Sequence, residues 1–243
     1  MTHALDDGGH RQLKDTVYLQ LRDDIVNGTL PPGAVLREAE LATRFGVSKT
    51  PLRDALVRLQ KDGFVEIPPY RSAVVVGYSR TDLREIYELR ELLEGACARQ
   101  AAFHISADAL AELARIVRAS ADCVTGPEMG RVMGPGMGPG MGTAVAAGRE
   151  DELAGLLDQF DLVMYAQSRN SRIDEMVGNI RGHIQRIGRL TTGIPGRLAK
   201  SVPEHQAIYE AIVQRDGAAA EALMRRHILS VMADQLTSIA EAQ

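Results

Sequence analysis

One stretch of the chain, from Glu38 to Phe64, constrains the fold more than any other: EAELATRFGVSKTPLRDALVRLQKDGF. Apolar residues recur in it at helical spacing in two blocks, residues 38–45 and 49–61. Gly46 lies between the blocks, and glycine readily takes the left-handed conformation that ends a helix. Ser48 follows as an N-cap candidate for the second block. The stretch therefore predicts two short helices around a tight corner, which is the helix-turn-helix arrangement.

The second of these helices has a basic polar face. Five basic residues and one acidic residue lie between positions 44 and 61. In a helix-turn-helix the second helix enters the major groove of DNA, so this face indicates DNA binding. The helix pattern alone leaves one alternative open, a helical hairpin whose basic face is merely solvated.

The residues after the second helix predict a small β-hairpin. Residues 64–67 and 73–76 are mainly apolar and flank a turn at residues 68–72 that contains two prolines. Such a hairpin forms a β-wing beside the helix-turn-helix. Arg71 lies in the predicted turn, where it can reach a phosphate or the minor groove.

Residues 18–76 resemble the winged helix-turn-helix of the GntR family of bacterial transcription regulators. Three motifs carry the resemblance: I-x-x-G-x-L-x-P-G from Ile25, E-x-x-L-A from Glu38, and G-V-S-x-T-P-x-R-x-A-L from Gly46. The resemblance implies that residues at the start of the second helix and in the wing read the operator. With Arg44 from the basic segment, the predicted DNA-binding residues are Arg44, Ser48, Lys49, Thr50, Arg53 and Arg71.

Three positions depart from the family pattern. Lys49 stands where the family usually has arginine, which can grip guanine through two hydrogen bonds. Ala39 replaces a base-contacting arginine of some members, and Ser72 replaces the usual glycine of the wing tip. We therefore expect an operator that differs from those of the best-known members.

The composition suits two small domains or one large domain in a cytoplasmic protein. The chain has 243 residues and a net charge of −4. Its N-terminus does not resemble a signal peptide, no apolar run is long enough to span a membrane, and its two cysteines form no disulfide framework. We expect domains at 12–78 and 82–240, loosely attached residues 1–12, a first helix at 15–27, and Thr81 as the N-cap of the following helix.

From Asp82 onward the pattern is almost purely helical. The run EIYELRELLEGACARQAA and the later motif E-H-x-x-I-x-x-A-I-x-x-x-D from Glu204 resemble the FCD domain, the effector-binding domain of FadR-type GntR regulators. The resemblance implies an all-α bundle and a mainly α chain. Met-Gly-Pro-Gly repeats from Met133 to Gly142 predict a flexible insertion at about 125–148, because glycine and proline at this density cannot hold a helix. Helices are predicted near 83–98, 107–122 with Ser106 as N-cap, 152–168, 173–190, 204–214 and 218–240.

The resemblance also implies a metal site. Many FCD domains hold a divalent cation through an aspartate and three histidines, ligands that suit zinc, nickel or manganese. His205 and His227 match the two C-terminal ligand positions. Asp161 matches only part of the remaining ligand pair, an aspartate and a histidine. In an alignment without a gap, Asp161 stands in place of the histidine and Leu157 in place of the aspartate. In an alignment with a gap, Asp161 matches the aspartate and Tyr165 stands in place of the histidine. Either alignment leaves three predicted ligands, Asp161, His205 and His227.

Other roles for these residues remain open. His183 could substitute for the missing ligand, or the histidines could be satisfied core residues, one of them paired with Asp161. Without metal the cavity could still take an organic acid, although Arg90 could instead pair with Glu94 at the i, i+4 spacing. The predicted effector-binding residues are Arg90, Asp161, His205 and His227.

The sequence thus predicts a cytoplasmic, homodimeric transcription regulator without catalytic activity. Two recognition helices would lie about one DNA turn apart on a pseudo-palindromic operator. The helical domain would bind a small metabolite, such as a carboxylate, directly or through the metal. Two other classes remain as alternatives: a metal-dependent enzyme built on the helical bundle, and a protein–protein adaptor that uses its winged helix without DNA.

Overall fold

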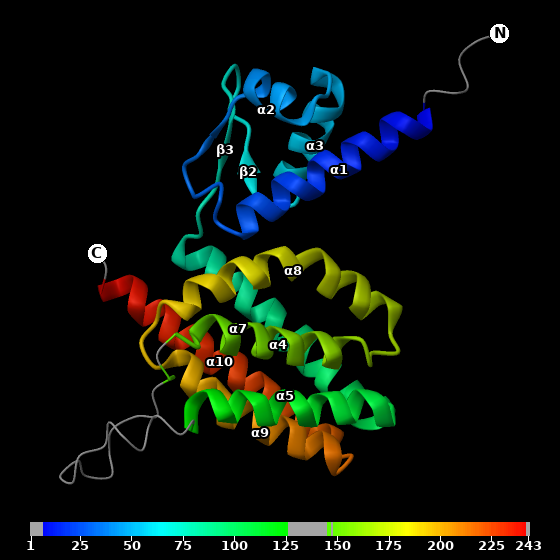
Figure 1. Ribbon diagram of the computed structural model, residues 1–243, viewed down its shortest axis with the longest axis vertical. Helices are drawn as coiled ribbons and strands as arrows, with labels where there is room; N and C mark the ends of the chain where they lie inside the picture. Colours follow the sequence, from blue (N-terminus) through cyan, green and yellow to red (C-terminus); the bar gives the residue numbers. More distant parts are fainter. Residues whose placement is uncertain (1–6, 126–144, 147, 242–243) are drawn as a thin grey trace. The chain divides into compact units, whose positions relative to one another are not determined.

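The chain folds into two compact units. The structure is a computed structural model that describes residues 7–125, 145–146 and 148–241. The first unit ends at Ser79 and the second begins at Arg80. Helices dominate both units, and the small sheet belongs to the first (Figure 1). The predicted fold class, mainly α with a winged helix-turn-helix before a helical bundle, is confirmed.

The first unit combines helices with a three-stranded antiparallel sheet. The strand order is β1-β3-β2, with Val35 opposite Val74 and Val65 opposite Val75. The strand β1 pairs with β3 and extends the predicted two-stranded wing. It was not predicted, because two residues are too few to show an alternating pattern. The elements are α1 (Asp7–Val26), β1 (Val35–Leu36), α2 (Glu38–Phe45), α3 (Lys49–Lys61), β2 (Val65–Glu66) and β3 (Ala73–Val75).

The corner between α2 and α3 has the predicted geometry. Gly46 adopts a φ of 64°, and its N–H donates to the carbonyl oxygens of Ala42 and Thr43. Leu52 and Leu59 are completely buried in the core that α3 forms with α1. Because this stripe of α3 faces the core, the opposite face of the helix stays exposed.

The helices α1 and α4 (Arg80–His104) begin earlier than predicted. α1 starts at Asp7, so residues 7–12 are helical, while residues 1–6 lie outside the described residues. α4 starts at Arg80, so Thr81 lies inside the helix and is not its N-cap. The first turn of a helix needs no apolar contact, which is why the periodic pattern locates helix starts poorly.

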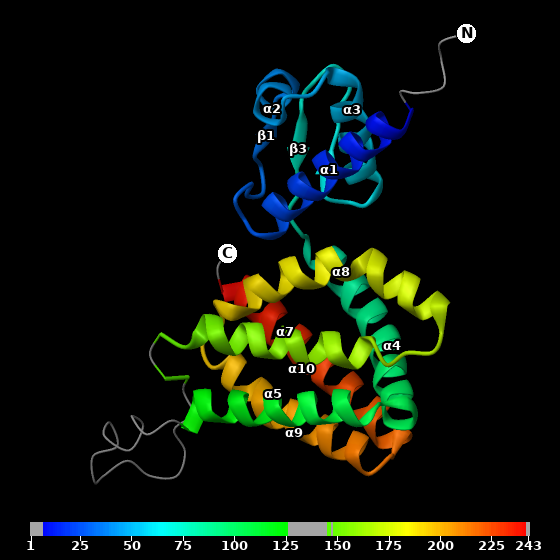
Figure 2. The same ribbon diagram turned by 45° about the vertical axis from the view of Figure 1, so that its right-hand side comes forward.

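The second unit is a helical bundle (Figure 2). In it α10 packs along α4 and α9, and α5 packs along α7. Gly95 of α4 permits close approach, because a Cβ there would lie 2.8 Å from Cγ of Arg225 on α10. The other helices are α5 (Ala107–Thr125), α7 (Glu150–Tyr165), α8 (Ser171–Thr192), α9 (Arg197–Val213) and α10 (Gly217–Glu241).

The start of α9 differs most from prediction. The helix begins at Arg197, seven residues before the predicted Glu204, and it contains Pro203. A proline inside a helix normally ends or kinks it, so the sequence pattern favours a start after the proline. The additional turns bring Arg197 and Ser201 into the same helix as His205.

Polar caps define the starts of two other helices. Ser106 caps α5 as predicted, with its Oγ 3.1 Å from the backbone nitrogen of Ala109. The side chain of Asn170 accepts from the backbone N–H groups of Arg172 and Ile173, so α8 begins two residues before the predicted start. Both caps satisfy N–H groups that have no partner within the helix.

The predicted insertion at 125–148 lies mainly outside the described residues. α5 ends at Thr125, and the backbone N–H of Ala146 donates to the carbonyl oxygen of Cys123 at 3.1 Å. None of the helices in the described part of the chain is long and apolar enough to cross a membrane.

We predict that Leu52→Ala lowers the free energy of unfolding by about 3 kcal/mol, because it leaves a cavity in the core of the first unit. Urea denaturation followed by circular dichroism measures this. Gln60→Ala, on the exposed face of the same helix, is the control and should change stability by less than about 0.5 kcal/mol. Equal stability of Leu52→Ala and the unsubstituted protein would contradict the assignment of the α3 core face.

Candidate functional site

The start of α3 presents polar side chains to solvent. Ser48, Lys49 and Thr50 are all exposed. Ser48 occupies the N-cap position with an extended backbone, as predicted, but its side chain makes no capping hydrogen bond. Its hydroxyl is therefore not committed to the helix end and is accessible to a ligand.

Two predicted DNA-binding arginines are exposed but ion-paired. Nε of Arg53 lies 2.9 Å from Oε2 of Glu38, and Nη2 of Arg44 lies 2.8 Å from Oδ2 of Asp24. Ion pairs at a protein surface contribute at most about 1 kcal/mol, so either arginine can exchange its partner for a phosphate or a base at low cost. Sequence reasoning treated Glu38 only as a family landmark, since a pair between two helices leaves no periodic signal.

The wing carries the remaining predicted DNA-binding residue. Arg71 is exposed in the turn between β2 and β3, where its backbone N–H donates to the carbonyl oxygen of Pro68 at 3.2 Å. All six predicted DNA-binding residues are thus exposed on the first unit.

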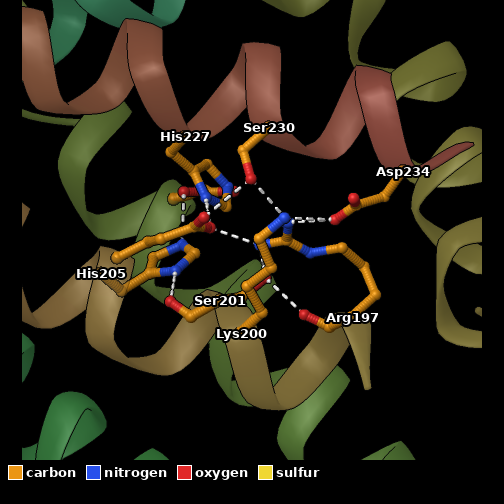
Figure 3. Close-up of polar contacts among 9 residues, drawn as sticks. Arg197, Lys200, Ser201, His205, His227, Ser230 and Asp234 are labelled. Atoms are coloured by element: carbon orange, nitrogen blue, oxygen red, sulfur yellow. Dashed lines mark hydrogen bonds and ion pairs between the residues drawn. The ribbon is translucent and has the colours of Figure 1, made fainter. Parts of the chain in front are cut away.

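The second unit contains a buried polar cluster formed by α7, α9 and α10. His205 of α9 and His227 of α10 are 4% and 5% exposed, and their ring centroids are 4.6 Å apart (Figure 3). Phe160 of α7 meets the ring of His205 edge-on with centroids 4.8 Å apart. Asp161 follows on α7, with Oδ1 3.5 Å from Nε2 of His205. The structure therefore brings the three predicted metal ligands to one place.

The protonation of His205 follows from its neighbours. Its Nδ1 lies 2.9 Å from the carbonyl oxygen of Ser201, and because a carbonyl only accepts, Nδ1 carries a hydrogen. Nε2 of His205 and Oδ1 of Asp161 are both buried and have no hydrogen-bond partner among the described residues. Burial lowers the pKa of His205, but Asp161, with the carbonyl of Ser201 and the carboxylate of Glu204, raises it by more, so the pKa lies above its ordinary value.

His227 is held by Glu204, a residue that sequence reasoning did not assign to the site. Nδ1 of His227 lies 2.6 Å from Oε2 of Glu204. Glu204 also accepts from Ser230 at 2.9 Å and from the guanidinium of Arg197. Burial opposes ionisation of Glu204, but these donors prevail and lower its pKa to about 2. Burial lowers the pKa of His227 to about 4, against the opposing effect of the Glu204 carboxylate.

Arg197 is the buried cation behind this arrangement. It is 1% exposed, and its Nη1 donates to Asp234 at 2.7 Å and to Ser230 at 2.9 Å. Figure 3 shows this guanidinium between α9 and α10. The predicted start of α9 excluded Arg197 from the helix, so only the position of Glu204 directly before His205 in the FCD-like motif pointed to this network.

Arg90 forms an ion pair with Glu94, four residues later on the same helix, which was one of the two roles left open by the sequence. Nε of Arg90 lies 2.6 Å from Oε1 of Glu94, and both side chains are buried. The hydroxyl of Tyr165 donates to the other oxygen of Glu94 at 2.7 Å. Arg90 is thus neutralised by its own helix.

The cluster has the donor chemistry of a metal site without forming a complete one. Two imidazoles and a carboxylate suit a divalent cation, and Nε2 of His205 and Oδ1 of Asp161, which no hydrogen bond to a described residue engages, have the chemistry of ligands to one. Ser201 and Glu204 already hold the Nδ1 atoms of the two histidines, which is how such ligands are oriented. Yet among the described residues, His183 included, no group of three or more His, Cys, Asp or Glu side chains is placed to hold a metal ion.

The fold and these two sites define a winged helix-turn-helix protein with a second, all-helical domain. Residues 13–75 match the gntR family of bacterial regulatory proteins, and residues 85–133 and 140–230 match the FCD domain. The chain therefore belongs to the GntR family of transcriptional regulators and carries an FCD domain. The interruption of the FCD match falls within the Met-Gly-Pro-Gly repeats.

Individual relatives agree with this assignment. An uncharacterized HTH-type transcriptional regulator from an unstable DNA locus of Streptomyces ambofaciens is 30% identical over 90% of this chain and 83% of its own length. Another, from the TAR-I ttuE-ttuC' intergenic region of Agrobacterium vitis, is 39% identical, but over only 42% of this chain and 58% of its own length. Escherichia coli McbR/YncC shares the fold, with a TM-score of 0.69, 20% identity, and coverage of 93% of this chain and 98% of that one. The protein is a transcriptional regulator and not an enzyme.

We predict that acid destabilises the second unit through His227. Unfolded His227 takes up a proton below about pH 6.5, whereas folded His227 with a pKa of about 4 does not, so stability falls as the pH falls from 6.5 to 4. This contribution amounts to about 3 kcal/mol, and denaturation at a series of pH values measures it. His227→Gln keeps an N–H donor for Glu204 and should flatten the profile, whereas the exposed control His104→Gln should not. An unchanged profile in His227→Gln would contradict the assignment.

Proposed function

We propose that this regulator binds its operator as a cytoplasmic homodimer and that a small molecule in the helical domain controls the operator affinity. The observation that carries the proposal is the buried pair of Nε2 of His205 and Oδ1 of Asp161, which have no hydrogen-bond partner in the part of the chain that the structure describes. Two facing acceptors at 3.5 Å need a proton, a cation or a donor between them. The helical unit is therefore suited to take up a further group at this point.

In the proposed complex, the exposed start of α3 lies in the major groove. Ser48, Lys49 and Thr50 reach base edges or phosphates, because their polar groups are accessible at the helix N-terminus. Arg53 leaves Glu38 for the DNA. Arg44 and Arg71 contact phosphates, which orient the protein on the duplex without reading its sequence.

Exposed leucines of the second unit support a homodimer. Leu89 and Leu92 on α4 are 47% and 59% exposed, and Leu229 on the adjacent α10 is 41% exposed. A second copy that packs against this apolar face would remove it from water. A two-fold dimer would place two α3 helices on a pseudo-palindromic operator.

The proposed effector is a carboxylate that binds through a divalent metal. Direct recognition by Arg90 is disfavoured, because Glu94 already neutralises it. Asp161, His205 and His227 would hold the metal, which would supply the positive charge and an open coordination position for the carboxylate. Ser201 and Glu204 keep the hydrogens of both imidazoles on Nδ1, so that each Nε2 carries a lone pair.

Contacts of α10 connect this cluster to the start of α4, where the second unit begins. α10 carries His227 and, two turns later, Gln235, whose Oε1 accepts from the hydroxyl of Tyr87 at 2.6 Å. The backbone carbonyl oxygen of the next residue, Leu236, accepts from the guanidinium of Arg80. Arg80 directly follows the first unit in sequence. An effector that favours one position of α10 would thereby shift the start of α4. The difference in the effector's affinity for the protein before and after this shift sets the change in operator affinity.

We predict that Arg53→Ala weakens binding to the operator about 30-fold, the equivalent of about 2 kcal/mol for a base contact. A fluorescence anisotropy titration against DNA from upstream of the protein's own gene measures the affinity. Arg172→Ala is a matched control, since Arg172 is exposed and paired with Glu175 on the second unit. Operator affinity that is unchanged by Arg53→Ala would count against the proposed interface.

We also predict that the purified protein binds about one Ni²⁺ or Zn²⁺ per chain and that His205→Ala abolishes this binding, because it removes one of only three ligands. Metal analysis after dialysis and calorimetric titration with Ni²⁺ give the stoichiometry. His104→Ala, at an exposed position, should bind metal normally. A protein that takes up no metal would contradict the metal-dependent effector site and leave a proton as the group between His205 and Asp161.

A further inference from the structure

Tyr70 occupies a strained position at the tip of the wing. Pro68, Pro69, Tyr70 and Arg71 form a turn closed by the hydrogen bond from the N–H of Arg71 to the carbonyl oxygen of Pro68, at 3.2 Å. Tyr70, the third residue of this turn, has a φ of 61°. Glycine and asparagine are the usual residues at such a position, because a side chain with a larger Cβ substituent is disfavoured at positive φ.

The other non-glycine residue with positive φ in the described chain shows what normally compensates for such strain. Arg215 has a φ of 59° in the connection between α9 and α10. Its guanidinium donates to the carbonyl oxygens of Ala102 and Ile105, at 3.2 and 3.4 Å. The side chain of Arg215 thus stabilises the fold that holds it, which offsets the backbone cost.

Tyr70 has no such compensation within the described chain. Its relative exposure is 107%, so the ring is fully in water. Neither a hydrogen bond nor an ion pair nor a ring contact joins its side chain to another described residue. The strained backbone weakens the isolated unit, and a ring that is fully in water adds nothing to its stability. An advantage of tyrosine at this position therefore lies in contact with another molecule.

We infer that Tyr70 is a DNA-contacting residue of the wing, with its ring against the sugar–phosphate wall of the minor groove and its hydroxyl donating to a phosphate or base-edge acceptor. The inference rests on the operator binding proposed above. The loop at 68–72 carries one cation, Arg71, and no acid, so its charge suits a polyanion. An aromatic ring supplies rigid apolar surface for a deoxyribose, and Arg71 next to it supplies the phosphate contact.

Tyr70→Asn separates this role from a structural one. Asparagine tolerates positive φ, so the turn persists and the melting temperature should stay constant or rise. The dissociation constant for the operator should increase about tenfold, while the slope of log K against log salt stays unchanged because no charge is lost. Arg71→Ala is the matched comparison in the same turn: it should weaken binding and also reduce that slope by about one.

Tyr70→Phe divides the effect between the ring and the hydroxyl. Affinity close to that of the unsubstituted protein assigns the contact to the ring, and affinity close to that of Tyr70→Asn assigns it to the hydroxyl; both support the inference. Operator affinity that is unchanged in Tyr70→Asn, while Arg53→Ala reduces it, overturns the inference and leaves the proposed function intact. If neither substitution changes the affinity, the proposed operator interface is overturned as well.

Discussion

The pairing of buried charges determines the interior of the helical unit. An uncompensated charge in a protein core costs several kcal/mol, so Arg197, which is almost completely buried, requires acceptors from two helices. Glu204 of α9 and Asp234 of α10 supply them, and this requirement holds the two helices in one register. Glu204 then has an oxygen for His227, which fixes the hydrogen on that imidazole. The orientation of the histidine cluster thus depends on an arginine that touches neither imidazole ring in the described contacts.

The DNA-binding unit separates its stable part from its reactive part on a single helix. The apolar stripe of α3 is buried against α1, whereas its polar face holds Arg53 in an exposed ion pair with Glu38. Buried leucines contribute much to stability, and exposed ion pairs contribute little. The unit can therefore change its charged contacts when it meets DNA without disturbing the core that positions them.

Elements with a strong periodic pattern were predictable, and elements defined by a single contact were not. The bounds of α2 and α3 follow from their apolar spacing, with Gly46 and Ser48 between them. The strand β1 has only two residues, and it exists because Val35 and Leu36 pair with β3 across the unit. The start of α9 was missed because Pro203 resembles a helix boundary, although the additional turns hold Arg197 in its ion pairs with Glu204 and Asp234. The left-handed backbone of Tyr70 depends on the turn that surrounds it, which residue types alone do not reveal.

The sequence by itself determined the winged helix-turn-helix, the helical second domain and the family, because these depend on periodicity and on motifs contiguous in the chain. It also pointed to Asp161, His205 and His227 as neighbours through the resemblance of two separate motifs. Only the tertiary structure decided how each of these side chains is used. It committed Arg90 to Glu94 and His227 to Glu204, and it left Nε2 of His205 facing Asp161 with no hydrogen bond to a described residue. Burial and hydrogen-bond partners are properties of packed helices, so a pattern along one chain segment does not contain them.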